Sequence, residues 1–266
     1  MVAVLEVTGI GGISFRQLYI HFNLMRYMNS SVEFDSLFIW NEYRYLEDDF
    51  LESVRYLPLV PEHYEVWSAH FADLLIRIGS VFDSFLKRAI FCESLNNIEN
   101  IDDCRNKDLK NIKITDYFNI FESTYNLSSK FLYELHESET ITPFSNWNEI
   151  TYTPLEWWKA YTSLKHDRFL NRKVATLKVT LDALGGLFLL NILHPETAFF
   201  LVDYNIIQSM FAKETIKDII SGKQRASLEP VYAKSNLFGY VYDPANHQFT
   251  DEHKRSILSP SYPEHD

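Results

Sequence analysis

The feature that most constrains this fold is a run of apolar side chains at helical spacing over residues 64–91. One side of a helix through this segment carries only large apolar groups: Phe71, Leu74, Leu75, Ile78, Phe82, Phe85 and Leu86. Because side chains three and four positions apart share one side of an α-helix, the spacing predicts a long amphipathic helix. We expect a mostly α fold around it.

Several other segments carry helical signals. Residues 35–54, 115–136, 153–166, 174–193 and 214–221 are predicted helices, whereas residues 237–242 alternate like a strand. The helix at residue 153 has the clearest start, because Thr153 can cap it, Pro154 suits its first turn and Glu156 lies three residues after the cap. Residues 96–111 and 140–153 are predicted to be irregular.

Length and composition limit the classes of protein. The 266 residues suffice for one large domain or two small ones, and a net charge of -11 disfavours binding of nucleic acid or acidic lipid over most of the surface. Cys92 and Cys104 form no disulfide framework, and no Cys or His has metal-ligand spacing, so we predict no metal and no cofactor. The apolar run 181–193 is short for about 30 Å of hydrocarbon and includes Asp182, so a cytoplasmic protein without a membrane segment is expected.

One segment is positively charged, although the chain as a whole is negatively charged. Residues 157–181 hold six Lys or Arg and one Asp, a formal charge of +5, and His166 lies among them. Histidine exchanges protons near neutral pH, and Lys and Arg bind phosphate, so one interpretation is a site for an anion with His166 as general acid or base. The other is a helix-end His favoured by the helix dipole, with ordinary cations beside it.

Further motifs resemble a known family. The chain contains I-x-P-F-x-x-W at residues 141–147, W-W-x-A-Y-x-x-L-K-H-D-R at 157–168 and A-T-L-x-x-x-L-x-A-L-x-x-L-F at 175–188. These resemble a group of uncharacterised bacterial proteins with a W-x-x-Y-N-x-x-K-H-x-R signature, which in turn is similar to the HEPN superfamily of helical bundles. The resemblance covers residues 35–193 and implies an N-terminal arm (1–34), a HEPN-like bundle (35–195) and a partly irregular C-terminal extension packed on the bundle (196–266).

The resemblance also implies a function. Active HEPN proteins are dimeric, metal-independent ribonucleases with an R-x(4-6)-H motif, and some carry an acid with a basic residue four positions later in an earlier helix. His166 matches the motif histidine; Tyr161 and Thr162 occupy the positions of the Arg and Asn of the common R-N-x-x-x-H form. Lys159 meets the looser spacing. Both Asp73/Arg77 and Asp83/Lys87 match the acid-plus-base spacing.

Two functions follow as alternatives. The first is an RNA-directed protein of bacterial defence or stress, with ribonuclease activity, a homodimeric state and RNA held at a local basic patch. Its candidate residues are His166, Arg168 and Lys159 for catalysis, Lys165, Arg172 and Lys173 for phosphate, and Tyr161, Asp167, Asp73 and Arg77 in support. The second is a non-catalytic module for dimerisation or protein interaction, in which the K-H-D-R cluster joins helices or subunits.

Overall fold

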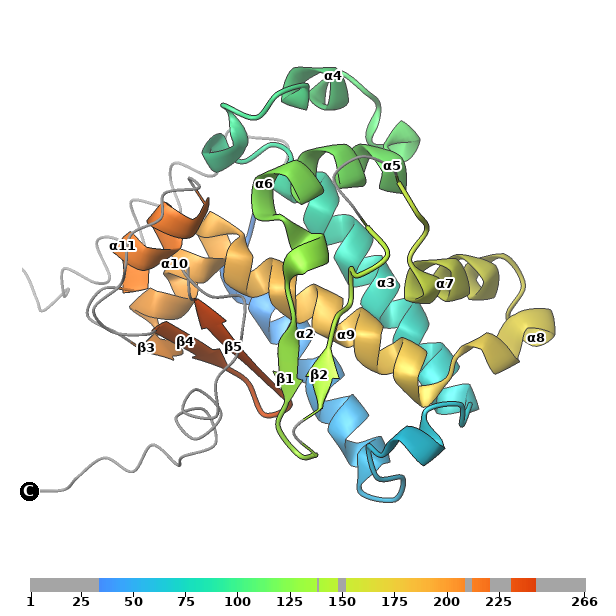
Figure 1. The fold of residues 1–266 in the computed structure, drawn as a ribbon. Coiled ribbons are helices and arrows are strands. Elements are labelled where there is room, and N and C mark those ends of the chain that lie inside the picture. The colour runs from blue at the N-terminus through green and yellow to red at the C-terminus, as the bar shows by residue number, and fades with distance from the viewer. Residues whose placement is uncertain (1–33, 138, 148–151, 209–211, 221–230, 243–266) are drawn as a thin grey trace, which may run out of the picture. The chain divides into compact units, whose positions relative to one another are not determined.

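Three long helices pack side by side at the centre of the fold (Figure 1). They are α2 (Ser36–Val54), α3 (Ala69–Ala89) and α9 (Leu177–Leu193). The computed structural model describes residues 34–137, 139–147, 152–208, 212–220 and 231–242, which all belong to the unit that begins at Phe34. The predicted N-terminal arm, apart from Phe34, lies outside the described residues. The mostly α character is confirmed.

Each central helix begins at a residue that caps it. The carboxylate of Asp35, the first residue of the predicted helix 35–54, accepts from the backbone N–H of Phe38. The Ser68 hydroxyl accepts from Phe71, so α3 starts five residues later than the apolar pattern indicates. Its predicted apolar side is fully buried, and α9 is buried on almost every side. These faces supply most of the core.

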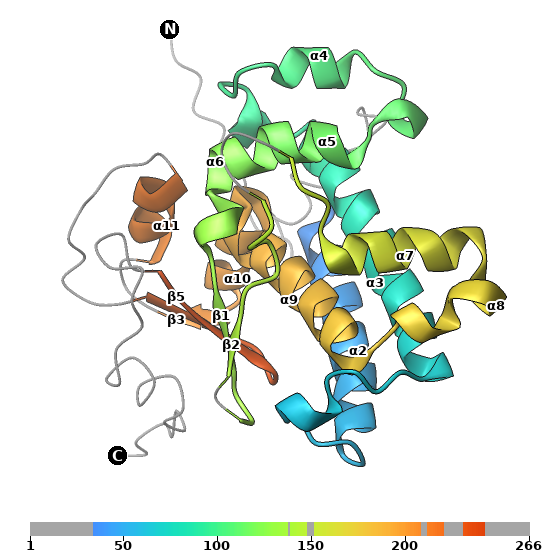
Figure 2. The same ribbon diagram turned by 45° about the vertical axis from the view of Figure 1, so that its right-hand side comes forward.

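The helix α7 (Glu156–His166) packs against α3 and α9 (Figure 2). Its predicted start at Thr153 is wrong, because the backbone stays extended through Leu155 and no side chain caps the first turn. The Leu155 side chain is buried in the core, which favours an extended entry over another helical turn. The contact between α7 and α3 is close: an added Cβ on Gly79 would lie 2.3 Å from Cδ2 of Tyr161.

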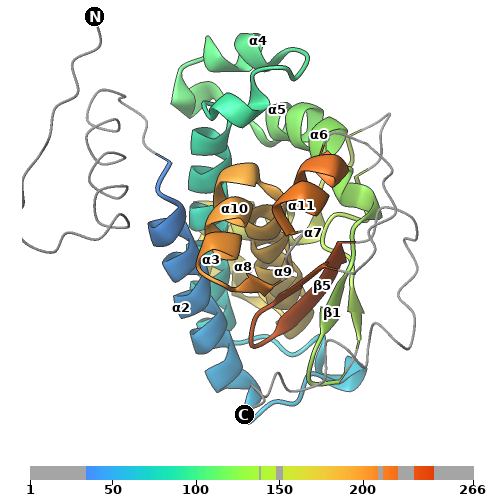
Figure 3. The same cartoon turned by 90° about the vertical axis from the view of Figure 1, so that its left-hand side faces the viewer.

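A five-stranded antiparallel sheet lies beside the helices (Figure 3). Its order is β2 (Thr140–Ile141), β1 (Leu132–Glu134), β5 (Phe238–Tyr242), β4 (Val231–Lys234) and β3 (Ile207–Gln208). β5 lies where the sequence predicts a strand. Tyr133 of β1 pairs with Gly239 of β5, so the predicted bundle and the predicted extension share one sheet.

The helix predicted over residues 115–136 is wrong in its second half. The helical segment runs through α5 (Ile114–Tyr117), a π-helical turn (Phe118–Glu122) and α6 (Ser123–Tyr125). It ends at Asn126, whose φ of 49° lies in the left-handed region that Asn tolerates. The chain then enters β1, because Leu132 and Tyr133 are buried against the sheet neighbours. Tertiary pairing here overrides the local helical pattern.

A buried carboxylate fixes the sheet to α2. Glu47 accepts from the hydroxyl of Tyr43 at 2.6 Å and from the backbone N–H of Leu237 at 3.1 Å, and Ser235 also donates to it. Burial, and then the nearby Glu47 carboxylate, raise the pKa of Tyr43 well above its ordinary value. The β4–β5 turn is thereby held against the central helices.

The shorter helices complete the described chain. α4 (Ile101–Arg105) and short 3-10 turns lie within the segment 96–111 that was predicted to be irregular. α8 (Arg168–Asn171) follows α7, and α11 (Ala212–Ile220) matches the predicted helix near the C-terminus. α10 (Pro195–Asp203), which the sequence pattern does not indicate, follows α9 after a bend of 77°. Among the described residues no single helix is long and apolar enough to cross a membrane, and only the bent pair α9 and α10 taken together meets the length and composition required.

Candidate functional site

The end of α7 and the start of α8 form a tight turn around Asp167. This residue leaves helical geometry, and its carboxylate caps α8 by accepting from Leu170 N at 2.9 Å. The Asn171 side-chain amide donates to the carbonyls of Ser163 and Asp167. Asp167, predicted as a supporting residue, therefore shapes the turn that carries the predicted cations.

The turn presents a cationic surface, which we define as Lys165, His166, Arg168, Arg172 and Lys173. All five side chains are exposed. Two of them lie over Trp67, with the Arg172 guanidinium carbon 5.8 Å and the Lys173 ammonium 6.0 Å from the centre of its ring. Lys165 lies 5.6 Å from the ring centre of Tyr161. Figure 2 shows α8 at the edge of the fold, beyond α7 and α3.

The predicted acid–base pair in α3 is not formed. Asp73 pairs instead with Arg168, at 3.2 Å, and Arg77 pairs with Asp49 of α2. The helix places Asp73 towards α8 and Arg77 towards α2, so each finds a partner on a neighbouring element. The other candidate pair is formed, with Lys87 2.6 Å from Asp83.

His166 and Tyr161, two residues of the predicted catalytic motif, lie in different surroundings. The His166 ring is exposed, and no described residue forms a hydrogen bond or ion pair with it. Tyr161 is only 4% exposed and fills the space over Gly79. Lys159 pairs with Glu156 within α7. The position expected for the nuclease Arg is thus a core position in this chain.

The two tryptophans at the start of the motif pack inward. Trp157 is buried, its indole N–H donates to the Pro143 carbonyl at 2.9 Å, and its ring meets Phe82 edge-on. Trp158 is half-buried against Phe82 and Tyr161. Both therefore hold α7 on α3 and offer little face to a ligand.

Sequence reasoning missed two exposed apolar residues that lie among the cations of this surface. Phe169 is 85% and Leu170 79% exposed, and both belong to α8. Exposure alone does not distinguish Phe169, since Tyr56 is 86% exposed, but Phe169 and Leu170 form an adjacent apolar pair flanked by Arg168 and Arg172. The signal was present in the order R-F-L-x-R, but no helical or strand period runs through it.

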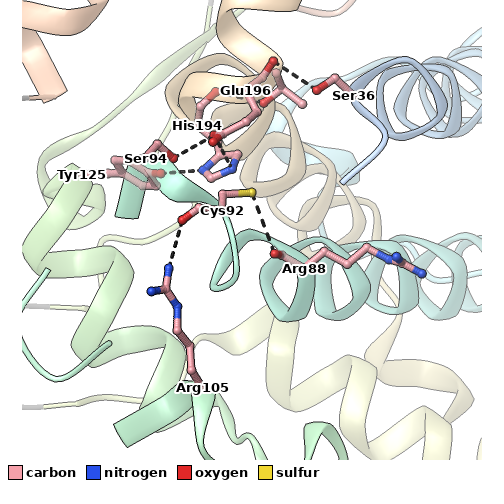
Figure 4. Close-up of polar contacts among 9 residues, drawn as sticks. Ser36, Arg88, Cys92, Ser94, Arg105, Tyr125, His194 and Glu196 are labelled. Atoms are coloured by element: carbon pink, nitrogen blue, oxygen red, sulfur yellow. Dashed lines mark hydrogen bonds and ion pairs between the residues drawn. The ribbon is translucent and has the colours of Figure 1, made fainter. Parts of the chain in front are cut away.

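A second cluster lies at the opposite end of α3, where α9 bends into α10; Figure 4 shows its polar contacts. It contains the thiol of Cys92, the imidazole of His194 and the carboxylate of Glu196, whose candidate ligand atoms all lie within 4.8 Å of one another. His194 Nε2 is 3.0 Å from Glu196 Oε2, and its Nδ1 is 2.7 Å from the hydroxyl of Tyr125. Ser94 donates to Glu196 Oε2 at 2.8 Å.

Several elements hold this cluster in place. Arg105 of α4 donates to the backbone carbonyls of Ile90 and Cys92, which fixes the end of α3. Ser36 of α2 donates to the backbone carbonyl of Glu196. Because the cluster draws on segments far apart in the sequence, residue spacing gave no indication of it.

Burial governs the electrostatics of the cluster. Burial, and then Glu196, raise the pKa of the Cys92 thiol, so Cys92 is a neutral thiol rather than an activated nucleophile. Burial opposes ionisation of Glu196, but the His194 imidazole and the Ser94 hydroxyl outweigh it and lower the pKa of Glu196 to about 2. Burial, and then Glu196, raise the pKa of Tyr125 well above its ordinary value.

Comparisons with family models, with curated proteins and with solved structures found no match to this chain.

Proposed function

We propose that this chain is a HEPN-like, RNA-directed protein and that its cationic surface binds single-stranded RNA. The observation that carries the proposal is the exposed Phe169 between Arg168 and Arg172 in α8. Proteins that bind single strands combine cations that follow the phosphates with aromatic rings on which bases stack. The α7–α8 turn supplies both kinds of group.

The distribution of charge supports the same proposal. The segment 157–181 has a formal charge of +5 in a chain of -11, so a polyanion is attracted to this region and repelled from much of the rest. Within the cationic surface, the described structure pairs only Arg168 with a carboxylate, and that pair with Asp73 is exposed. An exposed ion pair contributes about 0–1 kcal/mol to stability, so a phosphate can replace Asp73 as the partner of Arg168 at little cost.

Cleavage of RNA is a further step within this proposal. His166 is the only candidate acid or base that the cationic surface provides, and its exposed ring is open to a ribose or phosphate oxygen. A guanidinium to stabilise transition-state charge would come from Arg168, since Tyr161 is buried where HEPN ribonucleases carry Arg. HEPN-type dimerisation would bring two such turns together.

RNA binding is tested by titrating labelled single-stranded RNA into the full chain and measuring fluorescence anisotropy. Reversing Arg172→Glu and Lys173→Glu should weaken binding at least about tenfold and reduce the slope of log K against log salt by about 1.4 in magnitude, or about 0.7 per lost phosphate contact. The matched control is Lys110→Glu with Lys213→Glu, which makes the same charge change on exposed parts of other elements. Equal loss in both double variants would leave only non-specific attraction and refute the assignment to this surface.

Cleavage is tested with the same RNA in the presence of a chelator. If the protein cuts RNA without metal, His166→Ala should abolish cleavage while RNA binding and the circular dichroism spectrum stay unchanged. Binding without cleavage in the wild type would retain the RNA-binding proposal and reject the ribonuclease. Neither binding nor cleavage would reject both.

The apolar pair in α8 favours one alternative, a module for protein interaction or self-association. Phe169 and Leu170 are adjacent and expose most of their surface, as interface residues do before a partner covers them. Replacing both with Ser should then abolish a dimer seen by light scattering or sedimentation and leave RNA affinity unchanged. The RNA proposal expects the reverse for Phe169→Ser, with weaker RNA binding and an unchanged oligomeric state.

A further inference from the structure

The buried cluster at the α9–α10 bend has a composition that the proposed RNA function does not use. Cys92 lies just after α3, and His194 and Glu196 lie on either side of Pro195 at the start of α10. A thiol, an imidazole and a carboxylate with ligand atoms within 4.8 Å of one another form a donor set suited to a first-row transition metal. We propose that Cys92, His194 and Glu196 bind one Zn²⁺ ion.

His194 provides an independent observation in favour of a ligand. Its side chain is fully buried, and Nε2 has no hydrogen bond of good geometry. Glu196 Oε2 lies 3.0 Å away, but it can accept from Nε2 only when that nitrogen carries a proton; in the tautomer with the proton on Nδ1, Nε2 presents a lone pair to the carboxylate. Buried polar atoms rarely remain unpaired, because burial removes the water that would otherwise bind them. A cation bound to the Nε2 lone pair satisfies this atom.

The other ring nitrogen is placed as a metal site requires. His194 Nδ1 lies 2.7 Å from the Tyr125 hydroxyl. Histidine ligands usually donate their second ring N–H to a neighbouring acceptor, which fixes the tautomer and leaves the first nitrogen free for the metal. Tyr125 can accept this N–H, and Ser94 orients the carboxylate of Glu196 by donating to it.

The charges and the surroundings also suit zinc. A thiolate and a carboxylate balance the two charges of the ion, so the occupied cluster is formally neutral in a buried site. Rings of Phe34 and Phe85 lie 4.8 and 5.4 Å from the His194 ring and exclude competing water from one side. Glu196 is 31% exposed, which leaves a path to solvent, and water completes the fourth position of a tetrahedral ion.

Binding has a defined proton balance. Cys92 loses its thiol proton to the buffer as the sulfur–zinc bond forms, and the carboxylate of Glu196 binds as the anion. Nothing is oxidised or reduced. Because one proton is released, zinc binding should become tighter as the pH rises. The ion would join the end of α3 to the start of α10 and thus stabilise the fold.

The test uses the full chain, stripped of metal and titrated with zinc against a chromogenic competitor. The wild type should bind one tight equivalent. Cys92→Ser should bind at least about 100-fold more weakly, because losing a direct ligand costs more than losing an outer-shell partner, for which the loss is about 10–100-fold. Cys104→Ser is the matched control, since Cys104 is also a buried thiol but lies outside the cluster. Circular dichroism checks that both variants fold.

Cobalt provides a readout that does not depend on a variant. Co²⁺ bound in the wild type and in Cys104→Ser should give a thiolate-to-cobalt charge-transfer band, and this band should be missing from Cys92→Ser. Zinc should also increase the Tm of the wild type and not that of Cys92→Ser. Absence of a tight equivalent, cobalt binding without the band, or a band that persists in Cys92→Ser would each overturn the proposal and leave a hydrogen-bonded cluster without metal.

Discussion

The contact between Gly79 and Tyr161 decides how α7, and with it the cationic surface, is placed on α3. In Gly79→Ala the new methyl group would lie 2.3 Å from Cδ2 and 2.4 Å from Cγ of Tyr161. Carbon atoms in contact prefer about 3.5–4.0 Å, so the ring must move by about 1 Å or more. Because Tyr161 is buried beside Trp158, this movement has to separate the two helices.

The change in the free energy of unfolding caused by Gly79→Ala follows from two opposing effects. Alanine is favoured over glycine inside a helix by about 1 kcal/mol. Overpacking a core costs typically about 1–3 kcal/mol, and the short distance here places Gly79→Ala at or above the upper end. We expect a net loss of about 2 kcal/mol, equivalent to a decrease in Tm of about 4–8 °C for a unit of this size.

The assay is urea unfolding followed by circular dichroism. Gly186→Ala is the matched control, because it is also a buried helical glycine but its nearest neighbour is a Trp157 ring atom at 3.3 Å. It should change stability by less than Gly79→Ala. Tyr161→Ala should lower the free energy of unfolding by about 1–3 kcal/mol less in the Gly79→Ala background than in the wild type. An increase in stability for Gly79→Ala, or strict additivity of the two changes, would refute this account of the helix contact.

Further changes test other parts of the fold. Tyr161→Arg, which places an Arg at the position that matches the HEPN motif, should destabilise the protein by about 3 kcal/mol or more in urea unfolding, because it buries an unpaired charge. Normal stability with gained ribonuclease activity would contradict the buried placement. Glu47→Ala should lower the free energy of unfolding by about 3 kcal/mol, because several hydrogen-bond donors then lose their acceptor. The folded pKa of Glu196, about 2, lies below its ordinary 4.5, so its contribution to stability is present above pH 4.5 and is lost as the pH falls towards 2. Glu196→Gln should therefore flatten the acid side of the stability–pH curve, by at most about 3 kcal/mol. Asp73→Ala should change stability by less than about 1 kcal/mol, because its pair with Arg168 is exposed.

Local signals predicted the central helices well. The buried side of α3 and the cap at Asp35 follow from side-chain spacing and capping chemistry within single segments. The same kind of signal failed for residues 126–136. There Asn126 takes a left-handed conformation and β1 pairs with β5 about a hundred positions later, a contact that no local pattern contains.

The candidate sites show the same contrast between local features, which the sequence predicts, and contacts between distant segments, which it does not. The charge reversal around His166 is a local feature, and the structure places its cations on one exposed turn. The partner of Asp73 could not be predicted, because helical spacing allowed Arg77 and only the position of α8 selects Arg168. The cluster of Cys92, His194 and Glu196 depends on how the end of α3 meets the α9–α10 bend, so spacing alone could not reveal it.

We propose that RNA contacts this protein at the α7–α8 turn. Ultraviolet crosslinking of a single-stranded oligonucleotide to the full chain, followed by mass spectrometry of the crosslinked peptides, tests it most directly. We expect the main crosslink at Phe169, with a second at Trp67, whose ring lies beneath Arg172 and Lys173. Crosslinks confined to other elements, or none under conditions where RNA binds, would contradict the claim.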